Sequence, residues 1–365
     1  MNFDFDAGYL GRKCRVLAFL AAVAVVAIHS DCTPVLAAPA AWNVFVESLY
    51  CQRLTKWAVP FFFLLSGVWF ARGAYARGGV GYWGFLKGKW RSLVIPWIVF
   101  AIVGVALGTP LAVANNYLAH ADRGLLANTV FASGSVWEMV DKMFGITIPE
   151  PRQAGFLWYL RTLTVLFLFA PIWRFLLRLS PWLFLTGFVC LQILGVDIPC
   201  IYFGATHTFF LGVFLGGFND SLLLRKKVPG FLAAVFLCAG VALAVLWAGV
   251  DSGYWKFPYS ARLWRQLLPL VFGCGIWLGY DSIERYLPRK LPRFVNWSMW
   301  LYLTHNIIGG WFLAGMRYAL GKTDMVTVWL PLANIVFATS VSLGIGWFLS
   351  RKLPTAFEVC CGGRV

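Results

Sequence analysis

Apolar residues dominate this chain in ten long runs, each close to the roughly 20 residues that cross a bilayer as an α-helix. The fifth and sixth runs are separated only by the turn Asp197–Cys200, which predicts a tight hairpin. The pattern predicts an all-α fold: a polytopic membrane helical bundle of about ten transmembrane helices, forming a single domain over residues 1–365. The predicted helices cover residues 16–35, 54–71, 92–117, 156–177, 181–197, 200–218, 229–250, 263–282, 294–316 and 326–349.

Basic residues alternate along the segments between these runs. With the N-terminus placed in the cytoplasm, 20 of the 31 Lys and Arg fall on the inner side. Positive residues are enriched in cytoplasmic loops, so the alternation indicates that both termini are cytoplasmic. Residues 118–155 then form a long external loop, and a connection of this length is usually functional or covers a site.

The first run has a second interpretation. Residues 12–41 have the basic start, apolar middle and small-residue end of a signal peptide. Cleavage would leave nine helices and an external N-terminus. We favour retention, because His29 in the apolar stretch would have no use in a discarded peptide.

Composition excludes several classes of protein. Hydrophobic residues make up 60% of the chain and charged residues 13%, whereas soluble domains carry about 25% charged residues. The net charge of +16 does not indicate nucleic-acid binding, because the basic residues lie in short loops between apolar runs. The nine Cys have no metal-type spacing, so no metal site is expected. Scattered small hydrophobic Cys are favoured over an external disulfide among Cys32, Cys51 and Cys200.

His29 and Arg161 are among the polar residues inside apolar runs, where polar groups are expensive and mark functional sites. His29 is in the first run and suits general-base or nucleophilic chemistry, although a structural hydrogen bond to another helix is the alternative. Arg161 is in the fourth run and can orient an acceptor or stabilise an oxyanion; alternatively it reaches the outer headgroups. His207 is a weaker candidate, and His120 lies in the external loop.

Ser298, Tyr302 and His305 are spaced four and three residues apart, so they share one face of the ninth predicted helix. They form either a functional cluster or a structural polar stripe between helices. Ser66 and Gly67 end a Phe-rich run, where close helix packing is favoured over a nucleophilic Ser.

The inner segment from Arg72 to Arg91 has the densest group of basic residues on the cytoplasmic side. Guanidinium and ammonium groups there suit the phosphates of a cytosolic cofactor. The alternatives are a purely topological role and contact with anionic membrane lipids.

With these features together, the chain resembles acyltransferase family 3, whose bacterial members O-acetylate surface polysaccharides and related glycans. The resemblance covers nearly the whole chain. It is carried by VVAIHS, VPFFFLLSG, KGKWRSLVIPW, FLWYLRTLTVLFLFAP, FFLGVFLGG, SMWLYLTH and the final CCGGR.

The resemblance implies a ten-helix fold, cytosolic acetyl-CoA as acyl donor and an acceptor at or beyond the outer face. The family's first-helix His corresponds to His29, its fourth-helix Arg to Arg161, its ninth-helix Tyr and His to Tyr302 and His305, and its basic region to Lys87, Lys89 and Arg91, with Arg72 beside them. Many members also have an Arg eleven residues before the His, where this chain has Ala18. Arg15 lies one turn before Ala18 and about 40° from the face of His29, and it is the candidate substitute.

The sequence thus predicts an O-acyltransferase of the bacterial inner membrane that acetylates a glycan or polysaccharide hydroxyl. His29 would act as base or carry the acyl group transiently. A transporter or flippase for a glycan or lipid-linked sugar is the alternative, because buried His and Arg also suit a translocation path. That alternative favours an internal repeat and broken helices, and the sequence shows no repeat. The sequence carries no sign of an oligomeric state.

Overall fold

The computed structural model describes residues 3–31, 40–75, 81–118, 126, 129–146, 155–194, 203–217, 230–256, 261–320 and 325–363. Over these residues the chain is helical without any strand, which confirms the all-α prediction. The segments 32–39, 76–80 and 195–202 lie outside the described residues. The predicted hairpin turn at 197–200 and residues 32–39 of the predicted signal peptide therefore lie outside them, and His120 lies in a further gap, 119–125.

Fifteen α-helices are described in these ranges. They are α1 (Phe3–Ile28), α2 (Ala41–Glu47), α3 (Ala58–Tyr75), α4 (Gly81–Lys89), α5 (Ile95–Leu118), α6 (Val136–Phe144), α7 (Trp158–Leu168), α8 (Ala170–Leu179), α9 (Pro181–Leu194), α10 (Phe203–Gly217), α11 (Gly230–Asp251), α12 (Ala261–Ile283), α13 (Ser298–Leu320), α14 (Met325–Lys352) and α15 (Pro354–Cys360). π-Helical segments precede α3 (Ser48–Arg53) and α5 (Trp90–Val94), and 3-10 segments cover Gly155–Leu157, Glu284–Tyr286 and Arg293–Trp297.

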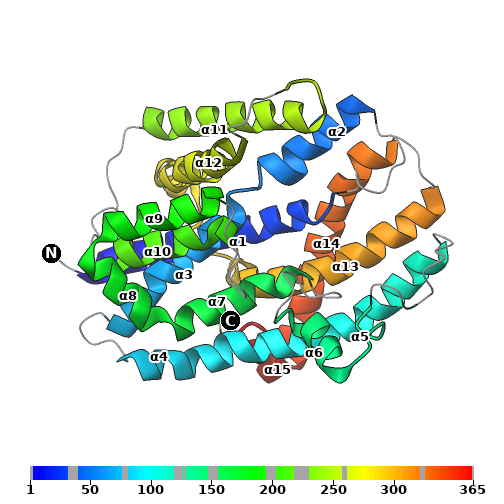
Figure 1. Cartoon of the computed structure of the whole chain (residues 1–365), viewed down its shortest axis with the longest axis horizontal. Coiled ribbons are helices and arrows are strands. Elements are labelled where there is room, and N and C mark those ends of the chain that lie inside the picture. Colours follow the sequence, from blue (N-terminus) through cyan, green and yellow to red (C-terminus); the bar gives the residue numbers. More distant parts are fainter. Residues whose placement is uncertain are drawn as a thin grey trace.

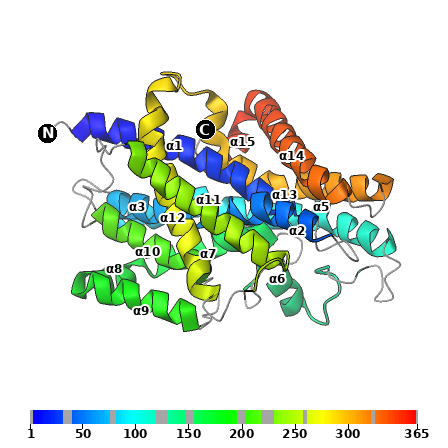
Figure 2. The same cartoon turned by 90° about the horizontal axis from the view of Figure 1, so that it is seen from above.

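Helix α1 lies inside the bundle, where it packs against α3, α13 and α14 (Figure 1). Leu17, Ala21 and Val25 follow one another at a spacing of four residues, so they form one buried face of the helix. Figure 2 shows α8 and α9 at one edge of the bundle and α14 and α15 at the opposite edge. The retention of this segment stays a prediction.

Four helical segments in the described part of the chain are long and apolar enough to cross a membrane. A fifth is added if the bent pair Gly155–Leu168 and Ala170–Leu179 is one span. The four are Ala41–Gly73, Gly81–Tyr117, Gly230–Asp251 and Trp329–Lys352. The apolar part of α1, residues 16–28, covers only about 20 Å at 1.5 Å per residue, less than the hydrocarbon core of a bilayer. The count of ten spans stays a prediction.

Several predicted helix bounds are wrong. The first helix begins at Phe3 rather than near residue 16, and it ends at Ile28 rather than residue 35. The predicted fourth helix, 156–177, is broken at Phe169 with a bend of 65°. Pro171 lies in the first turn of α8, where a residue without a backbone N–H is tolerated, so the sequence does favour a helix start there.

The predicted external loop 118–155 contains α6, which packs back against α5. The ring centroids of Phe144 and Trp97 are 5.8 Å apart. Trp97 is 21 residues before Leu118, or roughly 30 Å along the helix. The segment therefore returns along α5 instead of remaining beside the end of that helix.

Helices α3 and α10 are in backbone contact. A Cβ atom on Gly67 would overlap the carbonyl oxygen of Phe209, and one on Gly212 would overlap that of Leu64. Small residues are what allow two helices to approach this closely. The packing role predicted for Gly67 is confirmed.

Candidate active site

Two histidines from distant parts of the sequence meet in the bundle. His29 follows the last residue of α1, and His305 lies in the second turn of α13; their ring centroids are 5.2 Å apart. His305 is 1% exposed, whereas His29 is exposed. The imidazole of His305 is therefore held inside the protein, next to the imidazole of His29, which is accessible from outside the core.

The hydrogen bonds of His305 fix its tautomer. Nδ1 lies 2.7 Å from the carbonyl oxygen of Tyr302 and 3.2 Å from that of Leu301. Carbonyl oxygens only accept, so Nδ1 carries the proton and Nε2 has the lone pair. Nε2 is buried and has no hydrogen-bond partner among the described residues. His305 thus keeps a basic nitrogen available beside His29.

The backbone around His29 is held by two amide side chains. Asn334 of α14 donates from Nδ2 to the hydroxyl of Ser30 at 2.9 Å, and both residues are buried. Gln52 donates from Nε2 to the carbonyl oxygen of Ile28 at 3.1 Å. These contacts fix the residues on either side of His29, and the sequence analysis identified neither amide.

Tyr302 links the histidines to α7. Its hydroxyl donates to the carbonyl oxygen of Phe156, and its ring centroid lies 6.1 Å from that of His305 and 5.6 Å from that of Tyr159. The hydroxyl of Tyr159 lies 3.0 Å from the hydroxyl oxygen of Ser66. Ser66, Tyr159, Tyr302 and His305 therefore form a continuous chain of aromatic and hydroxyl groups.

This chain begins at a cavity of about 610 Å³. Tyr159 and Ser66 form part of its wall, and the exposed side chain of Arg15 lies in another part of it together with Lys89. The Nζ atom of Lys89 lies 5.0 Å from the ring centroid of Phe85. The cavity is lined by Gly8, Gly11, Cys14, Arg15, Ala18, Phe62, Leu65, Ser66, Trp69, Lys89, Tyr159, Leu163, Phe167, Val295, Asn296 and Ser298.

The structure separates the five cations predicted to bind the donor. Arg15 and Lys89 meet at this cavity, whereas Arg72, Lys87 and Arg91 are outside its lining. Arg72 lies in the last turn of α3. Lys87, Lys89 and Arg91 lie on the continuous helix Gly81–Tyr117, so the predicted basic loop is helical from Gly81 onward.

Arg161 is 4% exposed and donates from Nη1 to the carbonyl oxygen of Gly145, the residue that ends α6. It follows Tyr159 by two residues, which is about 200° around an α-helix. Arg161 therefore lies on a different face of α7 from the tyrosine that contacts Tyr302. The hydrogen bond to Gly145 connects Arg161 to the end of α6, so its role beside the acceptor stays a prediction.

Lys13 has a different role from the topological one assigned by the charge count. It is 1% exposed, and its Nζ atom lies 2.7 Å from the carboxylate of Asp281 in α12 and 4.1 Å from the ring centroid of Trp277. Because α1 starts at Phe3, Lys13 lies well inside the helix. It joins α1 to α12 through a partly buried ion pair.

The remaining polar candidates, His207 and Ser298, occupy positions that indicate a structural role. His207 is buried in α10, and no described contact joins it to His29 or His305. Ser298 begins α13 and lines the cavity, although it shares a helix face with Tyr302 and His305. Tyr159, like Asn334 and Gln52, was not predicted from the sequence; its only signal is its place in the FLWYLRTL motif, two residues before Arg161.

A family model described as an acyltransferase domain matches residues 16–351. The chain belongs to acyltransferase family 3. It is an acyltransferase, and its apolar helices make it a multi-pass membrane protein. The matched range includes both histidines, while Arg15 lies one residue before it. Neither the curated proteins nor the solved structures include a significant match.

Proposed function

We propose that this acyltransferase moves an acetyl group from cytosolic acetyl-CoA to a hydroxyl of a glycan or polysaccharide, in the inner membrane of a bacterium. The proposal includes ten transmembrane helices with both termini cytoplasmic. The observation that carries it is the path from a cavity with two cations, past Tyr159 and Tyr302, to the paired His29 and His305.

Each end of this path suits one substrate. Arg15 and Lys89 supply the positive charge that the phosphates of CoA require. The exposed imidazole of His29 suits an acceptor hydroxyl, because a base must lie within hydrogen-bond reach of the proton that it removes. The pantetheine arm would extend from the cations past Ser66 and Tyr159, with its thioester toward the histidines.

The reaction then needs one base and a path for its proton. His29 removes the proton of the acceptor hydroxyl as the oxygen attacks the thioester carbonyl carbon. The carbon–sulfur bond breaks, the acyl group stays on the acceptor, and the proton returns to the departing CoA thiolate. In the alternative, His29 itself attacks the thioester carbonyl carbon and the CoA thiolate leaves. The imidazole then carries the acyl group until the acceptor hydroxyl attacks it. Nε2 of His305 can accept a proton in either route.

Acetyl-CoA turnover in membranes that contain the protein tests the proposal directly. We expect release of free CoA thiol together with radiolabelled acetyl groups in the glycan fraction, both absent from membranes with His29→Ala. Transfer from a different acyl-CoA would correct the donor. Glycan movement across the membrane without CoA release would support the transporter alternative and contradict the proposal.

The cavity predicts a difference between two neighbouring lysines. Lys89→Gln removes a cavity cation, so the apparent KM for acetyl-CoA should rise about tenfold with a smaller change in kcat, because phosphate contacts lie far from the reacting carbonyl. Lys87→Gln removes the same charge from the same helix outside the cavity and should leave KM unchanged. Steady-state kinetics over a range of acetyl-CoA concentrations measures both.

Arg15 gives the same experiment a second arm. Arg15→Lys keeps the charge and loses the planar fork, so a several-fold loss of kcat/KM with normal membrane levels would support a bidentate phosphate contact. Lys89 would have no part in donor binding if Lys87→Gln and Lys89→Gln had equal KM values. Arg15 would have none if Arg15→Lys and Arg15→Gln were both fully active.

A further inference from the structure

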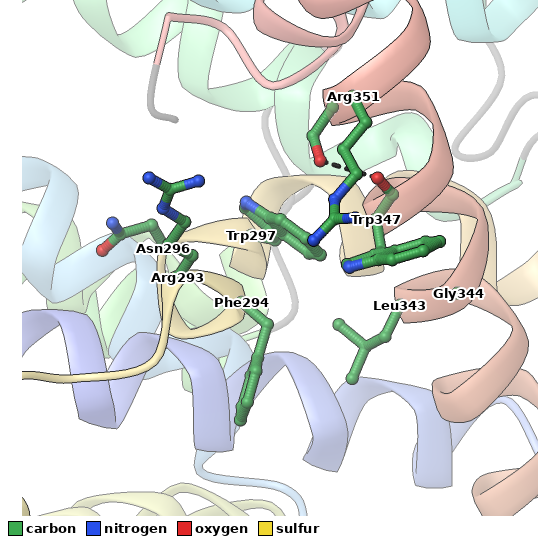
Figure 3. Close-up of a pocket in the computed structure, with 9 residues that line it drawn as sticks. Arg293, Phe294, Asn296, Trp297, Leu343, Gly344, Trp347 and Arg351 are labelled. Carbon is green, nitrogen blue, oxygen red and sulfur yellow. Dashed lines mark hydrogen bonds between the residues drawn. The ribbon is translucent and has the colours of Figure 1, made fainter.

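A second cavity, of about 770 Å³, lies between the 3-10 segment Arg293–Trp297 and the last turns of α14 (Figure 3). Its lining combines aromatic, aliphatic and basic side chains. None of the lining residues is acidic. The lining consists of Arg293, Phe294, Asn296, Trp297, Leu343, Gly344, Trp347, Ser350 and Arg351.

The cavity changes from apolar to basic along its length. Figure 3 shows Phe294 and Leu343 at one end and Arg293 and Arg351 toward the other. Leu343 and Arg351 are eight residues apart on α14, which corresponds to about 12 Å along the helix. A ligand that fills this space has an apolar part beside Leu343 and an anionic part beside the two guanidinium groups.

Both guanidinium groups are available for an anion. Neither Arg293 nor Arg351 forms an ion pair with a described carboxylate, and both side chains are exposed. The Arg351 guanidinium lies 4.2 Å from the ring centroid of Trp347, which holds it over the cavity wall. Arginine binds phosphate oxygens through two parallel N–H groups, so phosphate is the anion that fits best.

The position of the cavity relative to the membrane identifies the ligand class. Helix α14 from Trp329 to Lys352 is apolar enough to span a bilayer, and its last turn carries Arg351 and Lys352. Trp347 lies one turn before them, in the place where interfacial aromatic residues are enriched. The basic end of the cavity is therefore at headgroup level and the apolar end is at acyl-chain level.

We propose that this cavity binds one anionic phospholipid, with its phosphate held by Arg293 and Arg351 and an acyl chain against Phe294 and Leu343. Asn296 lines both this cavity and the one that contains Arg15 and Lys89. A bound headgroup would thus hold the 3-10 segment that also forms part of the wall of the cavity with Arg15 and Lys89. The proposal does not depend on the identity of the acyl donor or acceptor.

Lipid binding to the purified full chain tests this directly. Short-chain phosphatidylglycerol and phosphatidylcholine are added to protein in neutral detergent, and native mass spectrometry measures occupancy while a thermal shift reports stabilisation. We expect one phosphatidylglycerol to bind at least tenfold more tightly than phosphatidylcholine. Arg293→Gln with Arg351→Gln should remove that preference.

Arg289→Gln with Lys290→Gln is the matched control, because it removes two exposed inner charges outside the cavity. The preference should survive in the control and partly in Arg293→Lys with Arg351→Lys, which retains both charges and also checks folding. Equal losses in the Gln pair and the control would overturn the proposal. The proposal would also be overturned if the Gln pair raised the Kd for CoA without any change in lipid preference. That result would mean that Arg293 and Arg351 bind the phosphates of the donor.

Discussion

His29→Ala is expected to abolish acyl transfer while leaving a folded protein in the membrane. His29 is exposed and lies at the end of α1, and its ring lies beside the buried His305. Removing it creates no cavity in the core. A general base contributes roughly 10²–10⁴-fold to a rate, and the loss would be larger if His29 carries the acyl group. Release of CoA thiol in membranes with matched protein levels measures the effect.

Two further histidine variants make this result specific. His305→Asn keeps a donor near the position of Nδ1 for the carbonyl oxygens of Tyr302 and Leu301, but it removes the free nitrogen at Nε2. It should fold and lose most of the activity. His207→Gln changes the buried histidine of α10 and should retain activity within a few-fold. Wild-type turnover in His29→Ala would remove His29 from the mechanism.

The sequence identified the histidines but not their contact. Each was found because a polar group in an apolar run is costly, which is a local property of the chain. Their meeting depends on how α1 packs against α13, two helices separated by some 270 residues in sequence. The spacing of Tyr302 and His305 on one helix face was readable from the sequence because helical periodicity is local.

The sequence could not assign the basic residues correctly, because a count of loop charges treats them as equivalent. Lys13 pairs with Asp281 inside the bundle, Lys89 reaches the cavity and Lys87 on the same helix does not. The difference between the two lysines depends on the face of α4 that packs inward. The start of α1 at Phe3 was missed for a related reason: polar residues in the first turns hid a helix that tertiary packing stabilises.

The importance of Tyr159 and the return of α6 along α5 also depend on tertiary structure. A tyrosine in an aromatic-rich helix has no distinguishing pattern, and its importance arises from its contacts with Ser66 and Tyr302. The segment that contains α6 reads as a polar connection between two apolar runs. Only the packing of Phe144 on Trp97 shows that it returns along α5.

Arg161→Lys is expected to lower acyl transfer roughly 10²-fold, the size typical of losing a donor that stabilises a developing oxyanion. Arg161 is buried, and its Nη1 already donates to the carbonyl oxygen of Gly145. The predicted role in the reaction would use a second N–H group of the planar fork. Lys can keep the bond to Gly145 but cannot reproduce the fork.

Arg161→Met separates this catalytic role from an anchoring role. It removes every donor and leaves the Gly145 carbonyl oxygen buried without its partner, at a cost of about 1–3 kcal/mol. Helix α6 should then loosen, which hydrogen exchange over residues 136–146 and trypsin cleavage at Lys142 would detect. Arg161→Lys should lose rate with normal protection of α6, whereas Arg161→Met should lose both.

Glu138→Gln is the matched control for α6. It breaks the partly exposed ion pair in which Nζ of Lys142 lies 2.6 Å from Oε1 of Glu138, and it leaves Arg161 unchanged. Exposed pairs contribute little to stability, so protection and rate should both stay near wild type. If Arg161→Lys transfers acyl groups at the wild-type rate, the arginine is an anchor for α6 alone. If Arg161→Met leaves α6 protected, the bond to Gly145 does not hold that helix in place.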